Sequence, residues 1–213
     1  MAVITDDFAR ANSDTLGTAA GGWSWTETLG DADISSGTVI CGGADGTAAD
    51  ARAETDLSGA PQYAQAEVIT LSTGSSAAAI GVIVQFSASA RGYYVFYVRG
   101  DTNNYRLFRS DAGTYTQIGT TLTEAIPARP FTAYIEIDGS GNITGKIDGT
   151  TKRTATDTTH AANRRTGIFV NNVSGLGSSA VDDFEAGDVG GGIVFLMHSP
   201  LLGGGGNIGG LVA

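Results

Sequence analysis

VITDDF at residues 3–8 and SAVDDFEA at residues 179–186 contain the same tripeptide, Asp-Asp-Phe, and lie at the two ends of a series of strand-like segments. In each copy the aromatic residue alternates with acidic neighbours, which is typical of a half-buried strand. Between the two copies, short runs of strand-forming residues are separated by glycine-rich turns. We therefore predict one all-β unit whose first and last strands lie side by side and close the fold.

The intervening runs recur at the short, regular spacing of a β-sandwich or barrel, and no long segment has a helical period. Gly92–Arg99 (GYYVFYVR) is apolar or aromatic on both faces. We expect it to be a central strand, with one face in the core and the other beneath a loop or in a groove. The clearest predicted strands are Ala64–Leu71, Ala78–Ser87, Gly92–Arg99, Asn104–Arg109, Thr114–Gly119, Phe131–Asp138, Asn142–Ile147, Thr166–Val170 and Ala180–Ala186.

Charge and composition exclude some classes of function. The net charge of −10 leaves no basic stripe that could neutralise phosphates, so we expect no nucleic-acid partner. Cys41 is the single cysteine; it cannot form an intrachain disulfide and is expected to be a small buried hydrophobe. No apolar run is long enough for a membrane span, and the N-terminus lacks the features of a secretory signal. These features predict synthesis in a cytoplasm.

A series of landmarks occurs in the order found in a known family. They are DFARAN at residues 7–12, Leu16-Gly17, GGWSWT at residues 21–26, YRLFR at residues 105–109 and VDDF at residues 181–184. In these landmarks the chain resembles the concanavalin A-like (laminin G-type) jelly-roll domains that are common in bacteriophage virion proteins. The resemblance implies an antiparallel β-sandwich over residues 1–188 and leaves residues 189–213 as a separate glycine-rich tail.

The tail carries no formal charge after Asp188 and contains apolar segments between glycine runs. Exposed apolar segments invite aggregation unless something covers them, so we expect neighbouring subunits to do so. Together with the family resemblance, this predicts a non-enzymatic virion structural protein, synthesised in the host cytoplasm. It would be a homo-oligomeric capsid decoration or a tail or fibre component that docks on other virion subunits. The predicted assembly residues are Ile193, Val194, Phe195, Leu196, Met197, Leu201 and Leu202.

Two ligands are compatible with such a sandwich. A lectin-like adhesion module would stack host surface glycans on aromatic side chains, for which Trp23, Trp25 and Tyr93 are the candidates. The alternative is that the two tryptophans plug one end of the sandwich. Calcium would take loop carboxylates such as Asp182 and Asp183 as ligands. Aspartate is also a common turn residue, which is the competing interpretation.

A glycosidase is the second alternative, because the resembling family includes such enzymes. The nearest approach to a carboxylate pair is Glu136-Ile137-Asp138, which runs directly into the turn Gly-Ser-Gly and lacks a further glutamate. The histidines, His160 and His198, are not accompanied by a G-x-S-x-G motif. The sequence therefore predicts no catalytic residue.

Overall fold

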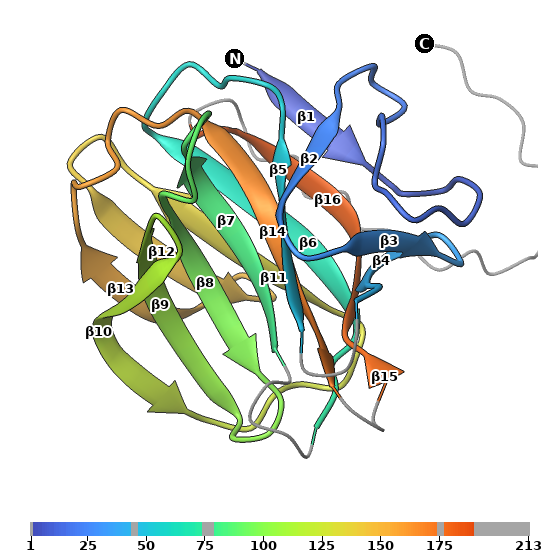
Figure 1. The fold of residues 1–213 in the computed structure, drawn as a ribbon. Helices are drawn as coiled ribbons and strands as arrows, with labels where there is room; N and C mark the ends of the chain where they lie inside the picture. Colours follow the sequence, from blue (N-terminus) through green and yellow to red (C-terminus); the bar gives the residue numbers. More distant parts are fainter. Residues whose placement is uncertain (1, 44–46, 74–78, 174–176, 190–213) are drawn as a thin grey trace, which may run out of the picture.

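The computed structural model describes residues 2–43, 47–73, 79–173 and 177–189, and these residues form strands and turns. The strands build two antiparallel sheets that lie face to face, with β7, β8 and β14 in front of β6, β11 and β16 in Figure 1. No helix in these segments is long and apolar enough to cross a membrane. The all-β sandwich expected from the sequence is confirmed.

Each sheet holds eight of the described strands. The first, called the β6 sheet, contains in spatial order β13 (Thr150–Thr156), β12 (Asn142–Ile147), β11 (Phe131–Ile137), β6 (Gln62–Thr70), β16 (Ala180–Asp188), β4 (Thr38–Cys41) and β3 (Ala32–Ser35), with β1 (Val3–Asp6) paired to β16. The second, called the β8 sheet, contains β10 (Thr114–Thr123), β9 (Asn104–Asp111), β8 (Tyr93–Arg99), β7 (Ala79–Phe86), β14 (Arg165–Val173), β5 (Ala48–Ala53) and β2 (Trp25–Leu29), with β15 (Gly177–Ser178) paired to β14.

The two Asp-Asp-Phe copies meet as predicted. Strands β1 and β16 pair antiparallel, with Val3 opposite Gly187 and Asp6 opposite Phe184. The copies nevertheless differ in conformation. In the first, Asp6 is buried and begins a turn, whereas in the second the register shifts after Asp182 and Asp183 adopts a positive φ of 46°. The second copy is therefore a bulge within a strand, which re-orients its side chains.

The main core lies between the sheets and follows the period-2 alternation of the strands. In β11, Ala133, Ile135 and Ile137 are buried in it, as predicted by the alternation that places these three residues of Phe131–Asp138 on one face. Cys41 is also buried and forms no disulfide, in agreement with its predicted role.

Strand β8 is buried on both faces, as its composition predicts. Tyr94, Phe96 and Val98 enter the main core between the sheets. Tyr93 and Val95 belong to a second apolar cluster on the opposite face of the β8 sheet. A sheet face turned away from the core that still buries aromatic rings is unusual, because such a face is ordinarily polar.

Some strands lack a recognisable sequence pattern. Strand β5 was not predicted, because it is built around the buried alanines Ala49, Ala51 and Ala53, and alanine has a low preference for strands. Strand β13 was not predicted either, because it is a polar strand at the edge of the β6 sheet and buries little apolar surface. The short strands β2 and β3, of five and four residues, were also missed.

Candidate functional site

Trp25 lies at the centre of an aromatic cluster that joins the chain ends. Its ring centroid is 5.8 Å from Phe8 and 5.0 Å from Phe184, the two aromatic residues of the repeated tripeptide. Trp23 packs beside it at 4.9 Å. Trp25 is only 7% exposed, and its Nε1 donates a hydrogen bond to Asp6 at 2.8 Å. Trp25 is thus a core residue rather than an exposed stacking surface, while glycan contact by the half-buried Trp23 stays a prediction.

The predicted calcium ligands Asp182 and Asp183 lie on β16 without converging with a third ligand. The backbone N–H of Asp183 donates to the carboxylate of Asp182. Burial, together with the charges of Asp183 and Glu67, raises the pKa of Asp182 to about 6. Within the described residues, no group of three or more His, Cys, Asp or Glu side chains has the arrangement of a metal site. Calcium binding therefore stays a prediction without geometric support.

The carboxylate pair at the end of β11 has structural partners. Glu136 forms an ion pair with Lys146 at 2.8 Å and accepts a hydrogen bond from the hydroxyl of Tyr134. Asp138 accepts hydrogen bonds from the backbone N–H groups of Ser140 and Asn142 in the following turn. The side-chain amide of Asn142 also donates to Asp138, at 2.8 Å, and this bond together with the backbone bonds holds the pKa of Asp138 below its usual value. A general acid needs a raised pKa, which Asp138 does not have.

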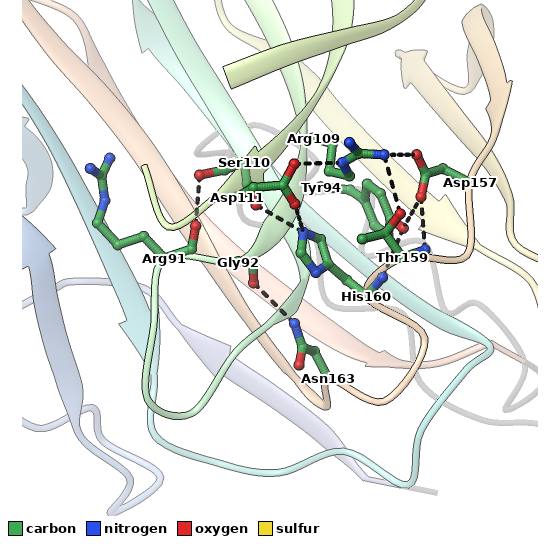
Figure 2. Close-up of polar contacts among 10 residues, drawn as sticks. All are labelled: Arg91, Gly92, Tyr94, Arg109, Ser110, Asp111, Asp157, Thr159, His160 and Asn163. Carbon is green, nitrogen blue, oxygen red and sulfur yellow. Dashed lines mark hydrogen bonds and ion pairs between the residues drawn. The ribbon is translucent and has the colours of Figure 1, made fainter. Parts of the chain in front are cut away.

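A polar network ties the loop after β13 to the β8 sheet (Figure 2). Tyr94 donates from its hydroxyl to Asp157 at 2.7 Å, and Arg109 donates to the other carboxylate oxygen at 2.7 Å. Burial opposes ionisation of Asp157, but these bonds and those from Thr159 outweigh it and hold its pKa far below the usual value. Asp157 is therefore a permanent anion that fastens the two sheets together at this end.

His160 in the same loop is held by backbone and carboxylate groups. Its Nε2 lies 2.8 Å from the carbonyl oxygen of Ser110 and 3.3 Å from a carboxylate oxygen of Asp111. The hydroxyl of Ser110 does not face His160, because it donates to the carbonyl of Arg91 at 2.6 Å, as Figure 2 shows. A Ser-His-Asp triad requires the serine hydroxyl to bond the imidazole, so His160 here anchors a loop. His198 lies outside the described residues.

A second polar network shows that the outer face of the β8 sheet is concave. Asp50 on β5 accepts a hydrogen bond from the hydroxyl of Tyr93 on β8, which in turn bonds the hydroxyl of Tyr115 on β10. Strands β5 and β10 are five positions apart in this sheet, which corresponds to about 24 Å in a flat sheet. Side chains this short can link them only because the sheet is strongly curled. The network thus bridges a trough.

The side chains of this bridge are held by hydrogen bonds, and the charge of Asp50 is paired. Asp50 is fully buried and forms an ion pair with Arg91 at 2.6 Å. Burial, followed by the charge of Asp50, raises the pKa of Tyr93, so its hydroxyl remains a donor. Tyr93 itself is completely buried, so its ring offers no exposed surface for a glycan. Its role is to fix Tyr115, which is 38% exposed.

Beside the bridge lies a hollow of about 160 Å³. Four aromatic residues and two arginines line it: Tyr97, Phe108, Tyr115, Phe169, Arg99 and Arg106. The rings of Tyr97 and Phe108 meet edge to face at 5.6 Å, and those of Phe108 and Tyr115 do so at 6.1 Å. The hollow is smaller than the roughly 300–1,000 Å³ of pockets that enclose a whole small molecule. It therefore suits part of a ligand that extends beyond it.

Gly81 makes the floor of the hollow possible. It lies on β7 between Phe169 of β14 and Tyr97 of β8, and these rings approach within 5.3 Å across it. A Cβ atom at this position would fall 2.5 Å from a methyl carbon of Val95. Glycine inside a central strand weakens the sheet and often marks a close approach of other groups.

From the sequence, the second face of Gly92–Arg99 was expected to lie beneath a loop or in a groove, but most residues of the hollow were not identified. Phe108, Tyr115 and Phe169 stand in predicted strands that give no sign of sharing a face. The order of strands in the sheet brings them together. The predicted assembly residues Ile193, Val194, Phe195, Leu196, Met197, Leu201 and Leu202 lie outside the described residues.

No protein-family model matches the chain, and no curated protein matches it in sequence. Several solved structures resemble it. The carbohydrate recognition domain of Emp47p shares 12% identity at a TM-score of 0.61, over 87% of this chain and 94% of that domain. The carbohydrate-binding module CBM66 from Bacillus subtilis shares 16% identity at a TM-score of 0.58, over 77% of this chain and 92% of the module.

A prokaryotic β-1,3-1,4-glucanase (lichenase) derived from a mouse hindgut metagenome is also similar. It shares 10% identity at a TM-score of 0.58, over 88% of this chain and 99% of that chain. At such low identities these likenesses concern the fold. The protein has the antiparallel β-sandwich of a concanavalin A-like jelly roll.

Proposed function

We propose that the protein binds carbohydrate in the aromatic hollow of the β8 sheet. The observation that carries the proposal is the hollow itself, in which aromatic rings and arginines share one concave face. Aromatic rings stack on the apolar faces of sugars, while arginine donors reach sugar oxygens. Two of the similar structures named above are carbohydrate-binding domains, which agrees with this function.

Tyr115 is the central residue of the proposal. Tyr115 and Val3 are the large apolar side chains exposed within the described residues, and Tyr115 lies in the hollow. Its ring packs edge to face against Phe108 and Tyr93, and its hydroxyl bonds Tyr93. Such a ring is already held in place before the ligand arrives, so binding costs little side-chain entropy.

The test is binding of a glycan panel by wild-type protein and Tyr115→Ala. We expect the variant to bind its best ligand about five- to thirtyfold more weakly, which corresponds to the loss of about 1–2 kcal/mol of apolar contact. Val3→Ala is the matched control, because it removes the other exposed apolar side chain from β1, in the β6 sheet. Equal binding by all three proteins, or no binding to the panel, would refute the proposal.

Hydrolysis is the second candidate, because one similar structure is a glucanase. We favour binding because the carboxylates associated with this face are each paired with an arginine. Asp50 pairs with Arg91, and Asp101 pairs with Arg99 at 2.8 Å. Glycosidases need two carboxyl groups that face the scissile bond, whereas these two are engaged by arginine side chains. Release of reducing ends from a polysaccharide panel would reverse this preference.

The virion role remains a prediction that depends on residues 189–213. None of the similar structures named above is a virion protein. A carbohydrate-binding sandwich and an assembly tail are compatible within one chain, so the two predictions are tested separately.

A further inference from the structure

The two arginines of the hollow differ in their partners. Arg99 donates from Nε and Nη2 to both carboxylate oxygens of Asp101, at 3.0 and 2.8 Å. Its charge is therefore compensated. Arg106 forms no ion pair with any of the described residues, and its buried Nε has no hydrogen-bond acceptor there. When the Asn104 amide is oriented with its oxygen toward Arg106, Nη2 donates to that oxygen at 3.0 Å.

An arginine in this condition is predisposed to bind an anion. A buried donor without an acceptor is unfavourable, and most such donors in proteins are satisfied. The planar guanidinium matches carboxylate and sulfate oxygens, with which it forms charge-assisted hydrogen bonds. Arg106 has to break no ion pair with the described residues in order to turn toward such a group. The aromatic side chains that line the hollow also lower the local dielectric, which strengthens the attraction.

We propose that the saccharide held in the hollow carries a single anionic group, a carboxylate or a sulfate ester, which Arg106 binds. This inference rests on the proposed carbohydrate binding and specifies its ligand class. The rings of Tyr115 and Tyr97 contact the sugar, and the acidic group lies against the guanidinium.

The charge of the whole chain limits the ligand further. A net charge of −10 repels long polyanions, so attraction over a distance does not bring the ligand to the hollow. Recognition depends on one local contact with Arg106. A short saccharide with one acidic group fits this arrangement better than a uniformly acidic polymer.

The experiment compares matched pairs of ligands by isothermal titration calorimetry. One pair is an oligosaccharide ending in glucuronic acid and the same oligosaccharide ending in glucose. A second pair is an oligosaccharide with and without one terminal sulfate. We expect the wild-type protein to bind an acidic member about tenfold or more tightly than its neutral partner. Preference within the first or the second pair identifies the acidic group as carboxylate or sulfate.

Arg106→Gln should weaken the acidic ligand about ten- to hundredfold and the neutral one much less, so that the preference for the acidic member is lost. Arg106→Lys keeps the charge without the planar donors and should retain part of the preference. Arg153→Gln is the matched control, because it removes the same charge from β13 in the β6 sheet and should change neither affinity. Far-ultraviolet circular dichroism and melting curves check that each variant is folded.

Each further outcome has a definite meaning. Equal affinity for acidic and neutral members, with Arg106→Gln harmless and Tyr115→Ala harmful, would overturn the anionic ligand and leave carbohydrate binding intact. Absence of binding to every pair, with a panel glycan still bound through Tyr115, would overturn the anionic ligand alone, whereas absence of binding to both the pairs and the panel would refute both proposals. Binding gained only after truncation behind Val189, without preference for the acidic members, would overturn the anionic ligand and identify the apolar tail as the occupant of the hollow in the full chain.

Discussion

Replacement of Asp6 by asparagine should destabilise the fold more than any other conservative change in the repeated tripeptide. Asp6 is buried, and its two carboxylate oxygens accept four hydrogen bonds. One oxygen bonds the backbone N–H of Phe8 at 3.0 Å and Nη1 of Arg10 at 2.7 Å. The other bonds Nη2 of Arg10 at 3.0 Å and Nε1 of Trp25 at 2.8 Å. In asparagine, an NH2 group would replace one of these two oxygens, and it cannot accept the hydrogen bonds of the two donors that this oxygen serves.

The magnitude follows from these contacts. Two charge-assisted hydrogen bonds are lost, each worth about 1.5–3 kcal/mol, and a buried charge loses its partner. Arg10 is 27% exposed at its side chain and regains part of this energy from water. We therefore expect the free energy of unfolding to fall by about 2–4 kcal/mol. For a domain of this size, that lowers Tm by roughly 10 °C.

Urea denaturation at neutral pH, followed by tryptophan fluorescence, measures this difference. Asp7→Asn is the matched control, because Asp7 is exposed and its side chain accepts a hydrogen bond from the backbone N–H of Ala9 at 3.1 Å. We expect a loss below about 1 kcal/mol for it. Trp25→Phe should also lower the free energy of unfolding less in the Asp6→Asn background than in the wild type, because Trp25 and Asp6 are hydrogen-bonded to each other. Equal losses for Asp6→Asn and Asp7→Asn would refute the reasoning.

Two other predictions concern β16 and the tail. The pKa of Asp182 is raised to about 6, above its value in the unfolded chain, so its contribution to stability is present below about pH 4 and disappears as the pH rises through about 6. In Asp182→Asn, the free energy of unfolding should fall less between about pH 4 and 7 than it does in the wild type. The difference should be about 1 kcal/mol, because solvent screens the partly exposed carboxyl group. A pH dependence equal to that of the wild type would contradict this prediction. A chain that ends at Val189 should become monomeric in light scattering if the tail mediates assembly, and an oligomer of unchanged size would reject that role.

The sequence was most informative where local pattern and burial agree. The repeated tripeptide, the two-sided strand Gly92–Arg99 and the alternation of Phe131–Asp138 predicted the closure, the centre and the facing of the sandwich. These features survive in the structure because a strand must present alternate residues to opposite faces. Strands whose residues have little strand preference or bury little apolar surface, such as the alanine-rich β5 and the polar edge strand β13, gave no clear signal and were missed.

The choice of site depended on the tertiary structure. By residue type, Trp23, Trp25 and Tyr93 were reasonable glycan candidates, but burial makes Trp25 a core residue and Tyr93 a support for Tyr115. The sequence determined by itself that the chain forms an all-β sandwich closed by its first and last strands, because hydrophobic periodicity is a local property. Only the tertiary structure decided that Tyr115, Phe108, Phe169 and Arg106 share one hollow, because strand order and sheet curvature arise from pairings between distant segments.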